Sequence, residues 1–232
     1  MKPGTITARG ITWERIPVRT RLLLKGDDLY QAISDGLGEA GLNPEPDDIL
    51  FVSEKAVGAT QGRYFLLDDG SLRPRYLARL LSHFVTRTPA GIGLGMPETM
   101  ECALRECGTF RILLASIIGA MGKLVGRRGD FYRIAGPLAR SIDGPTSGTI
   151  PPFNRAVSLA PLDPDGVSMR LTERFGCSAA VVDVNDLGGN VLGSWPPELD
   201  RELIVDILAD NPLGQGTEST PAGIIRKAGP SL

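Results

Sequence analysis

The sequence has few of the residues on which several common kinds of active site depend. Its 232 residues include one histidine, His83, and three cysteines, Cys102, Cys107 and Cys177, with no Cys-x-x-Cys pair. Structural zinc sites are built from clustered cysteine and histidine ligands, so one histidine and three scattered cysteines argue against a structural zinc site. Because unpaired cysteines are typical of a reducing compartment, we expect three free thiols.

The single histidine is a poor candidate for a catalytic base. Residues 75–87 carry apolar side chains at helical spacing, and His83 falls outside the apolar face that they predict. The pattern favours a solvated surface histidine over a general base that titrates near neutral pH. We therefore expect chemistry that does not depend on histidine. The predicted apolar face consists of Tyr76, Leu77, Leu80, Leu81, Phe84 and Val85.

The overall charge does not draw the chain to nucleic acid or to an anionic membrane. The formal net charge is −2, and aromatic residues make up 6% of the chain, too few for a base-stacking platform. The longest apolar stretch, residues 112–122, is far shorter than the about 20 residues that span a bilayer. The first residues contain no apolar run of signal-peptide length. We expect a soluble cytoplasmic protein.

The rest of the composition is typical of a folded protein with many turns. Apolar residues make up 42% and charged residues 22%, with 29 glycines and 18 prolines. The predicted strands are bounded by Gly, Asp and Asn turns and lack regular βαβ spacing, which predicts an α+β fold with mixed or antiparallel sheets and packed helices. We interpret residues 1–232 as one domain and leave open a subdomain around residues 85–145. Periodicity predicts helices at residues 29–37, 75–87, 167–175 and 199–207, and strands at residues 49–52 (continuing toward Lys55 and Val57), 179–184 and 222–226.

A polar turn follows the strand predicted at residues 179–184. In an extended segment Asp183 and Asn185 point to the same face. Their hard oxygen atoms suit Mg²⁺ or Mn²⁺, which nucleotide phosphates commonly complete. The alternative is a hairpin turn in which Asp and Asn bond the local backbone. An EF-hand is excluded, because Leu187 occupies a required oxygen position and Ser194 the place of the final glutamate.

Three further segments are candidates for ligand contact. Residues 161–166, Pro-Leu-Asp-Pro-Asp-Gly, predict a rigid bend. Residues 214–221 combine small residues with side-chain oxygens, which fits a surface loop or a site equally well. Residues 122–140 gather basic side chains around two aromatic ones, which is typical of a site for an anionic substrate or of a solvated face. The candidate substrate-binding residues in this basic segment are Arg127, Arg128 and Arg133.

Taken in order along the chain, five segments resemble the coenzyme F420 γ-glutamyl ligase family. No one segment is highly specific, but the ordered set is. The segments are Ile16-Pro17-Val18 through Lys25-Gly26-Asp27-Asp28-Leu29; Val52-Ser53-Glu54-Lys55 through Gln61-Gly62-Arg63; residues 161–166; Asp183-Val184-Asn185; and Gly214-Gln215-Gly216 through Pro221.

The resemblance implies GTP-dependent γ-glutamylation, with ATP as the other candidate donor. A carboxylate on an anionic, coenzyme-like acceptor would be phosphorylated to an acyl phosphate and then attacked by the amine of L-glutamate. Mn²⁺ or Mg²⁺ would bridge the phosphates and neutralise their charge. The resemblance also implies an α+β fold in a homodimer with intertwined sheets. It assigns metal binding to Asp183, Asn185, Asp143 and Gln215, and nucleotide binding to Lys55, Gln61, Gly62, Arg63, Gly214, Gly216, Thr217 and Glu218.

The chain departs from the family pattern at several of these positions. Gln61 and Gln215 stand where the family has acidic residues, and each amide removes a charge that a hard cation would use. Val184 replaces a threonine, and the family's Asn-Ala-Gly-x-Asp motif is Ile134-Ala135-Gly136 here, with the next acid at Asp143. Two alternatives therefore stay open beside the ligase. One is a non-catalytic ligand-binding relative, and the other is a ligase with a different anionic acceptor.

Overall fold

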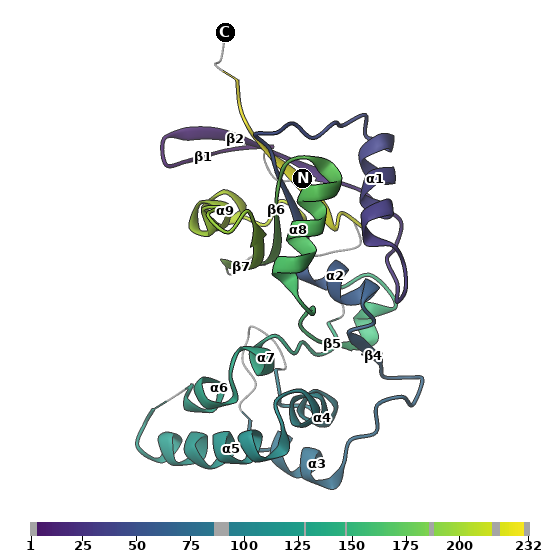
Figure 1. The fold of residues 1–232 in the computed structure, drawn as a ribbon. Coiled ribbons are helices and arrows are strands. Elements are labelled where there is room, and N and C mark those ends of the chain that lie inside the picture. Colours follow the sequence, from purple (N-terminus) through teal and green to yellow (C-terminus); the bar gives the residue numbers. More distant parts are fainter. Residues whose placement is uncertain are drawn as a thin grey trace. The chain divides into compact units, whose positions relative to one another are not determined.

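The chain forms two compact units, and the first unit contains both ends of the chain (Figure 1). The first unit comprises Met1–Gly62 and Pro161–Leu232, and the second comprises Arg63–Ala160. Residues 85–145 lie inside the second unit, and the one-domain assignment stays a prediction. None of the described helices combines the length and the apolarity needed to cross a membrane. The computed structural model describes residues 4–85, 93–127, 129–146, 148–185, 188–214 and 219–229.

The first unit is built on a six-stranded mixed sheet with the order β1-β2-β8-β3-β6-β7. Strands β3 and β6 are parallel, and every other neighbouring pair is antiparallel. The predicted α+β fold with a mixed sheet is confirmed. The strands are β1 (Thr5–Ala8), β2 (Ile11–Val18), β3 (Ile49–Ser53), β6 (Ser178–Asn185), β7 (Gly188–Trp195) and β8 (Ala222–Lys227).

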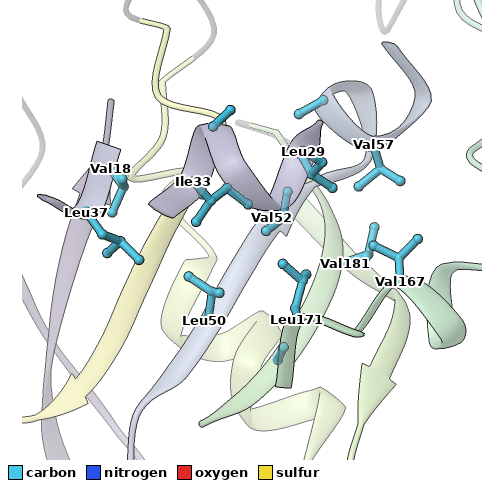
Figure 2. Close-up of a cluster of buried hydrophobic side chains, with 14 of the residues drawn as sticks. Val18, Leu29, Ile33, Leu37, Leu50, Val52, Val57, Val167, Leu171 and Val181 are labelled. Atoms are coloured by element: carbon cyan, nitrogen blue, oxygen red, sulfur yellow. The ribbon is translucent and has the colours of Figure 1, made fainter. Parts of the chain in front are cut away.

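Both faces of this sheet are covered, which explains why its central strand is a continuous apolar run. Side chains alternate along β3, so Leu50 and Val52 face the helices α1, α2 and α8, whereas Ile49 and Phe51 face α9. Figure 2 shows the first of these two layers, in which Ile33 of α1 and Leu171 of α8 pack over Leu50. These helices are α1 (Leu29–Glu39), α2 (Glu54–Thr60), α8 (Pro164–Phe175) and α9 (Arg201–Leu208).

Side-chain caps determine where the first-unit helices begin. Asp28 accepts a hydrogen bond of 3.0 Å from the backbone N–H of Gln31, and α1 begins at Leu29, the start predicted from periodicity. Ser53 caps α2 in the same way, so the chain turns helical at Glu54. The predicted continuation of the β3 strand toward Lys55 is therefore wrong, because the Ser53 hydroxyl satisfies a helix N-terminal amide and ends the strand.

The turn at residues 161–166 is the beginning of α8. Asp163 has a left-handed backbone (φ 47°), and its carboxylate accepts a hydrogen bond of 3.1 Å from the N–H of Gly166. The helix then packs on β7 at Gly193, where a Cβ atom would overlap the backbone of Pro164 and Asp165. Glycine at this position permits the close approach of helix and strand.

The second unit is mainly helical and has its own apolar core. It contains a two-stranded sheet of β4 (Tyr64–Leu66) and β5 (Ala156–Ser158). The helix predicted over residues 75–87 is α3, which spans only Tyr76–Ser82, and its apolar side chains divide into two rows. Leu81 is buried, whereas Tyr76, Leu80 and Phe84 are exposed, so the single apolar face expected there is wrong. The remaining helices are α4 (Pro97–Glu106), α5 (Thr109–Leu124), α6 (Asp130–Ala135), α7 (Pro137–Arg140) and the 3₁₀ turn Phe153–Arg155.

Glu101 of α4 is a buried acid held by two arginines. Its carboxylate accepts hydrogen bonds from Nε of Arg75 (3.0 Å) and of Arg105 (2.8 Å), and from the backbone N–H of Arg75 (3.1 Å). Burial by itself would raise the pKa of Glu101, but these donors outweigh it and lower the pKa below its ordinary value. The pair between α4 and the start of α3 therefore contributes to the stability of the second unit.

His83 and the cysteines have no place in a polar site. His83 is exposed at the end of α3, where its Nδ1 lies 2.6 Å from the carbonyl oxygen of Arg79, so the surface position predicted for it is confirmed. The three cysteines are free thiols. Burial raises the pKa of the Cys102 thiol to about 12 and that of Cys177 to about 11. These two side chains belong to the apolar cores.

Candidate active site

One end of the first-unit sheet brings together four of the segments singled out in the sequence. Strand pairing places Val18, at the end of β2, opposite Ala222, the first residue of β8, and Val52 of β3 also pairs with Ala222. In the parallel pair, Ser53 is the register partner of Val182. The loop after β2, the start of α2, the end of β6 and the segment before β8 therefore all lie at this end. Functional groups in α/β sheets commonly gather where strands end.

The parallel pairing of β3 and β6 brings an acid of each neighbouring segment to this end of the sheet. Ser53 pairs with Val182, Glu54 begins α2 directly after Ser53, and Asp183 follows Val182 within β6. Alternation along β6 gives Asp183 and Asn185 the parity of Val181, which faces the helical layer. The expectation that Asp183 and Asn185 share a face agrees with this strand. Glu54 is buried, whereas Asp183 and Asn185 are half-buried.

The same residues also belong to a hairpin. Asn185 pairs with Gly188, and Asp183 pairs with Asn190, so residues 186–187 connect β6 to β7. The hairpin predicted for this polar segment is therefore confirmed, whereas the bonding of Asp183 and Asn185 to the local backbone stays a prediction. A hairpin does not conflict with ligand binding, because side chains of a strand point away from the plane of the ladder.

Gln61 joins the turn after α2 to the turn before α8, 101 residues further along the chain. Its amide Nε2 donates to the carbonyl oxygen of Leu162 at 2.9 Å, and its Oε1 accepts from the N–H of Leu162 at 2.6 Å. The side chain thus pairs with one residue through both its donor and its acceptor. A glutamate side chain has no donor when ionised and would lose one of these two bonds.

The loop after β2 packs against the same turn. The backbone N–H of Gly26 donates to the carbonyl oxygen of Thr60 at 2.9 Å. Gly62 has a left-handed backbone (φ 69°), and a Cβ atom there would lie 2.8 Å from the side chain of Lys25. Within the loop, the Arg21 guanidinium and a backbone N–H hold the pKa of Asp27 below its usual range. The loop is thus braced at both ends.

The segment before β8 lies against the start of this loop. The N–H of Thr20 donates to the carbonyl oxygen of Ser219 at 3.0 Å, and the Ser219 hydroxyl donates to the carbonyl oxygen of Thr20 at 2.9 Å. The N–H of Ser53 donates to the carbonyl oxygen of Pro221 at 2.8 Å. Gly214 has a left-handed backbone and is exposed. The other candidates in this segment, Gln215, Gly216, Thr217 and Glu218, lie outside the described residues.

One residue predicted for nucleotide binding, Arg63, and one predicted for metal binding, Asp143, belong to the second unit. The Arg63 guanidinium pairs with both carboxylate oxygens of Glu106 (3.1 and 2.5 Å), and its Nε donates to the carbonyl oxygen of Ala160 at 2.9 Å. Asp143 exchanges two backbone hydrogen bonds with Ser158. Arg63 is thus committed to a partner within the second unit. The nucleotide role of Arg63 and the metal role of Asp143 stay predictions.

The basic segment forms a small apolar pocket with charged groups at its edge, also in the second unit. The pocket has a volume of about 440 Å³, and its apolar lining includes Met121 and Ile134. Asp130 is buried there and accepts from the guanidiniums of Arg133 (2.7 Å) and Arg127 (3.4 Å). One carboxylate thus offsets part of the positive charge that the sequence suggested for an anionic substrate. Arg128 lies outside the described residues.

The donors at the end of the sheet fit a cation that is completed by a ligand. Among the described residues no three His, Cys, Asp or Glu side chains form a group that could hold a metal ion by themselves. Asp183 and Asn185 supply hard oxygen atoms on one face, and Glu54 begins α2 directly after the neighbouring strand. Mg²⁺ and Mn²⁺ suit this set, because such ions are commonly held by one or two carboxylates plus substrate phosphates.

Sequence reasoning missed the positions of Glu54 and Lys25. Glu54 was part of a recognised segment, but nothing local shows that β3 pairs in parallel with β6 and so brings the start of α2 to the same end of the sheet as Asp183. Lys25 packs its methylene groups on Gly62, a contact between residues 37 positions apart. One indication of these two positions was present in the sequence, since Lys25 and Glu54 each lie directly beside a small residue where the chain changes direction. Exposed Lys55 completes the charged groups at the start of α2.

Comparison with known proteins finds a matching family model. The family model described as F420-0:Gamma-glutamyl ligase matches residues 17–191, more than half of the chain. The matched range contains the end of β2, the whole of α2, the turn before α8 and the end of β6. No curated protein matches the sequence. The chain therefore belongs to the F420-0:gamma-glutamyl ligase family, whose members form γ-glutamyl bonds.

Proposed function

We propose that this protein is a nucleotide- and divalent-metal-dependent ligase that joins L-glutamate to a carboxylate-bearing, F420-like acceptor. The observation that carries the proposal is the convergence of four family segments at one end of the first-unit sheet, the end at which α2 begins and Asp183 of β6 lies. Family membership supports γ-glutamyl bond formation as the reaction. GTP is the proposed phosphoryl donor.

The proposed reaction has two steps. In the first, a carboxylate oxygen of the acceptor attacks the γ-phosphorus of GTP, and GDP leaves. In the second, the amine of L-glutamate attacks the carbonyl carbon of the acyl phosphate, phosphate leaves, and the amine loses a proton. A bound divalent cation supplies charge neutralisation on the phosphates. The protein contributes mainly by positioning and by fixed charges, since phosphoryl transfer needs little covalent chemistry from side chains.

Named residues have distinct roles in this proposal. Asp183 and Asn185 hold the cation through their oxygen atoms, on the face that adjoins the start of α2. Lys55, exposed on the first turn of α2, offers a positive charge to phosphate oxygens. Gln61 holds the turn after α2 against Leu162 and so keeps the edges of the site in register.

The test pairs Asp183→Asn with Asp206→Asn, whose carboxylate lies on α9 at the other face of the sheet and pairs with Arg9. Thermal unfolding is followed with GTP or ATP, each with and without Mn²⁺ or Mg²⁺. A ligand at 100 times its Kd adds about 2.7 kcal/mol, which raises the midpoint by several degrees. We expect a shift in wild type and Asp206→Asn that requires nucleotide and metal together, and no shift in Asp183→Asn.

Product analysis completes the test. Incubation with GTP, Mn²⁺, L-glutamate and F420 precursors should give an adduct heavier by one glutamyl residue, together with GDP and phosphate in equal amounts. Full activity of Asp183→Asn would refute the metal role of this residue. If no acceptor acid yields a product although nucleotide binds, the ligase proposal fails.

A second candidate function is ligand binding without catalysis. It is favoured by one observation, namely that no three-carboxylate group occurs among the described residues while Gln61 replaces an acid of the family pattern. Metal-dependent GTP hydrolysis that disappears in Asp183→Asn would eliminate it. The product analysis with different acceptor acids also distinguishes a ligase with another anionic acceptor from the main proposal, because it shows which acid receives the glutamate.

A further inference from the structure

Helix α5 is apolar on both sides, although only one of them is covered. Its inner face carries Ile112, Ala115, Gly119 and Gly122, all buried, and Gly119 packs directly on Phe131 of α6. Its outer face carries a row of large apolar side chains, called here the α5 stripe. The stripe consists of Phe110, Leu114, Ile117, Met121 and Leu124, with exposed fractions of 81, 41, 58, 62 and 88%. A helix that is apolar all round is normally buried on every side.

The spacing of the α5 stripe is that of a helix-pairing seam. Successive members are separated by four, three, four and three residues, the alternation of a heptad repeat. The stripe is also nearly symmetric about Ile117, because Phe110 and Leu124 lie seven residues to either side of it. A two-fold axis near Ile117 would therefore place large side chains of one helix against large side chains of an identical, antiparallel helix. A self-complementary surface of this kind is what a two-fold interface requires.

No charge on the stripe opposes such pairing. The helix carries two cations, Arg111 and Lys123, and both are held by carbonyl oxygens of their own unit. Nε of Arg111 donates to Ile134 at 2.8 Å, and Nζ of Lys123 donates to Phe84 at 2.8 Å. The seam between them is uncharged over about three turns.

The exposed area suits a dimer. With roughly 150–200 Å² for each large side chain, the exposed fractions of the stripe correspond to on the order of 600 Å² of apolar surface. Such a patch is at the upper end of what monomers expose, and with its rim it approaches the ~800 Å² that each partner buries in a stable interface. We propose that the α5 stripe is the contact surface for a second copy of this chain, which pairs through an antiparallel α5–α5 seam.

This interface differs from the intertwined-sheet dimer implied by the family resemblance, because every residue of the stripe belongs to the second unit, whereas the six-stranded sheet belongs to the first (Figure 1). The proposal does not depend on the proposed enzymatic activity. If both interfaces form, the chain assembles beyond a dimer, and disrupting α5 halves the mass of the assembly.

The test compares Ile117→Glu with Leu138→Glu in the full-length chain, by sedimentation over a dilution series. Leu138 is an exposed apolar residue of α7 in the same unit, so it controls for the introduced charge. At the two-fold axis Ile117→Glu opposes two carboxylates and removes a central apolar contact. We expect its dimer dissociation constant to rise at least about 100-fold, with Leu138→Glu unchanged. Unaltered assembly of Ile117→Glu, or a wild type that is monomeric at all concentrations, would overturn the proposal.

A crosslinking measurement does not depend on how well Ile117→Glu folds. Near a two-fold axis the thiols introduced by Ile117→Cys approach each other, so mild oxidation should give a covalent dimer. Wild type gives the background from the half-buried Cys107, and Leu138→Cys is the matched control. Equal crosslinking of all three proteins would contradict the seam. Sedimentation of the monomer with lipid vesicles, lost in Ile117→Glu, would instead assign the stripe to a membrane surface and refute self-association.

Discussion

Replacing Gln61 by glutamate restores the residue type of the family pattern, and the structure predicts that it destabilises the fold. In the wild type the Gln61 amide both donates to and accepts from the backbone of Leu162. The introduced carboxylate keeps the bond from the Leu162 N–H. At neutral pH it has no proton for the Leu162 carbonyl, and two oxygen atoms then face each other at hydrogen-bond distance.

The magnitude follows from the one bond that is lost. A typical intramolecular hydrogen bond contributes about 1 kcal/mol, and leaving its acceptor facing a negative charge adds to that. Leu162 is exposed, so water can approach its carbonyl group and limits the penalty. We expect Gln61→Glu to lower the free energy of unfolding by about 1–2 kcal/mol at pH 7, and the unfolding midpoint by roughly 3–6 °C. Gln61→Ala, which loses both hydrogen bonds without adding charge, should lower the free energy of unfolding by a similar amount.

The pH dependence separates this explanation from general damage. The folded state disfavours the ionised form of the introduced carboxylate, so the pKa of that group is higher in the folded than in the unfolded protein. The penalty is therefore present above the folded-state pKa and disappears as the pH falls through it, because the protonated carboxyl can donate to Leu162. Urea unfolding of wild type, Gln61→Glu and Gln61→Ala at pH 7 and pH 4 measures this. A penalty of equal size for Gln61→Glu at both pH values would refute the reasoning.

Three further predictions concern stability and reactivity. Glu101→Gln should lower the free energy of unfolding by about 2 kcal/mol at pH 7, less than the loss of a fully buried ion pair, because both arginines are half exposed. Since the pKa of Glu101 is lowered from 4.5, the stabilisation by its carboxylate is complete above that pH. Urea unfolding should therefore show the difference from wild type shrinking as the pH falls below 4.5. Gly193→Ala should lower the free energy of unfolding by about 1–3 kcal/mol in the same assay, because the added methyl group overlaps the first turn of α8. An unchanged unfolding midpoint would contradict the close packing. With a thiol reagent at pH 8, Cys102 and Cys177 should react only after unfolding, because burial raises their pKa values to about 12 and about 11, whereas half-buried Cys107 should react first.

Local patterns were sufficient for several of the described helices and strands. The caps of α1 and the periodicity of α8 and α9 lie within a few neighbouring residues, and these elements form where expected. The errors arose where two local preferences compete. At Ser53 the hydroxyl cap ends β3, although the apolar pattern continues, and in α3 apolar side chains spaced by four residues form an exposed row instead of one buried face.

By itself, the sequence determined several helices and strands and the mixed α+β class, which follow from composition and periodicity. Its ordered short segments also carried the resemblance to the family to which the chain belongs. Only the tertiary structure decided which polar groups meet. The parallel pairing of Ser53 with Val182 joins residues more than 100 positions apart, and so do the two hydrogen bonds between Gln61 and Leu162. Such contacts depend on strand order and on helix packing, which no local pattern contains. The exposed stripe on α5 likewise follows only from the tertiary structure, which shows that the other face of the helix packs in the core.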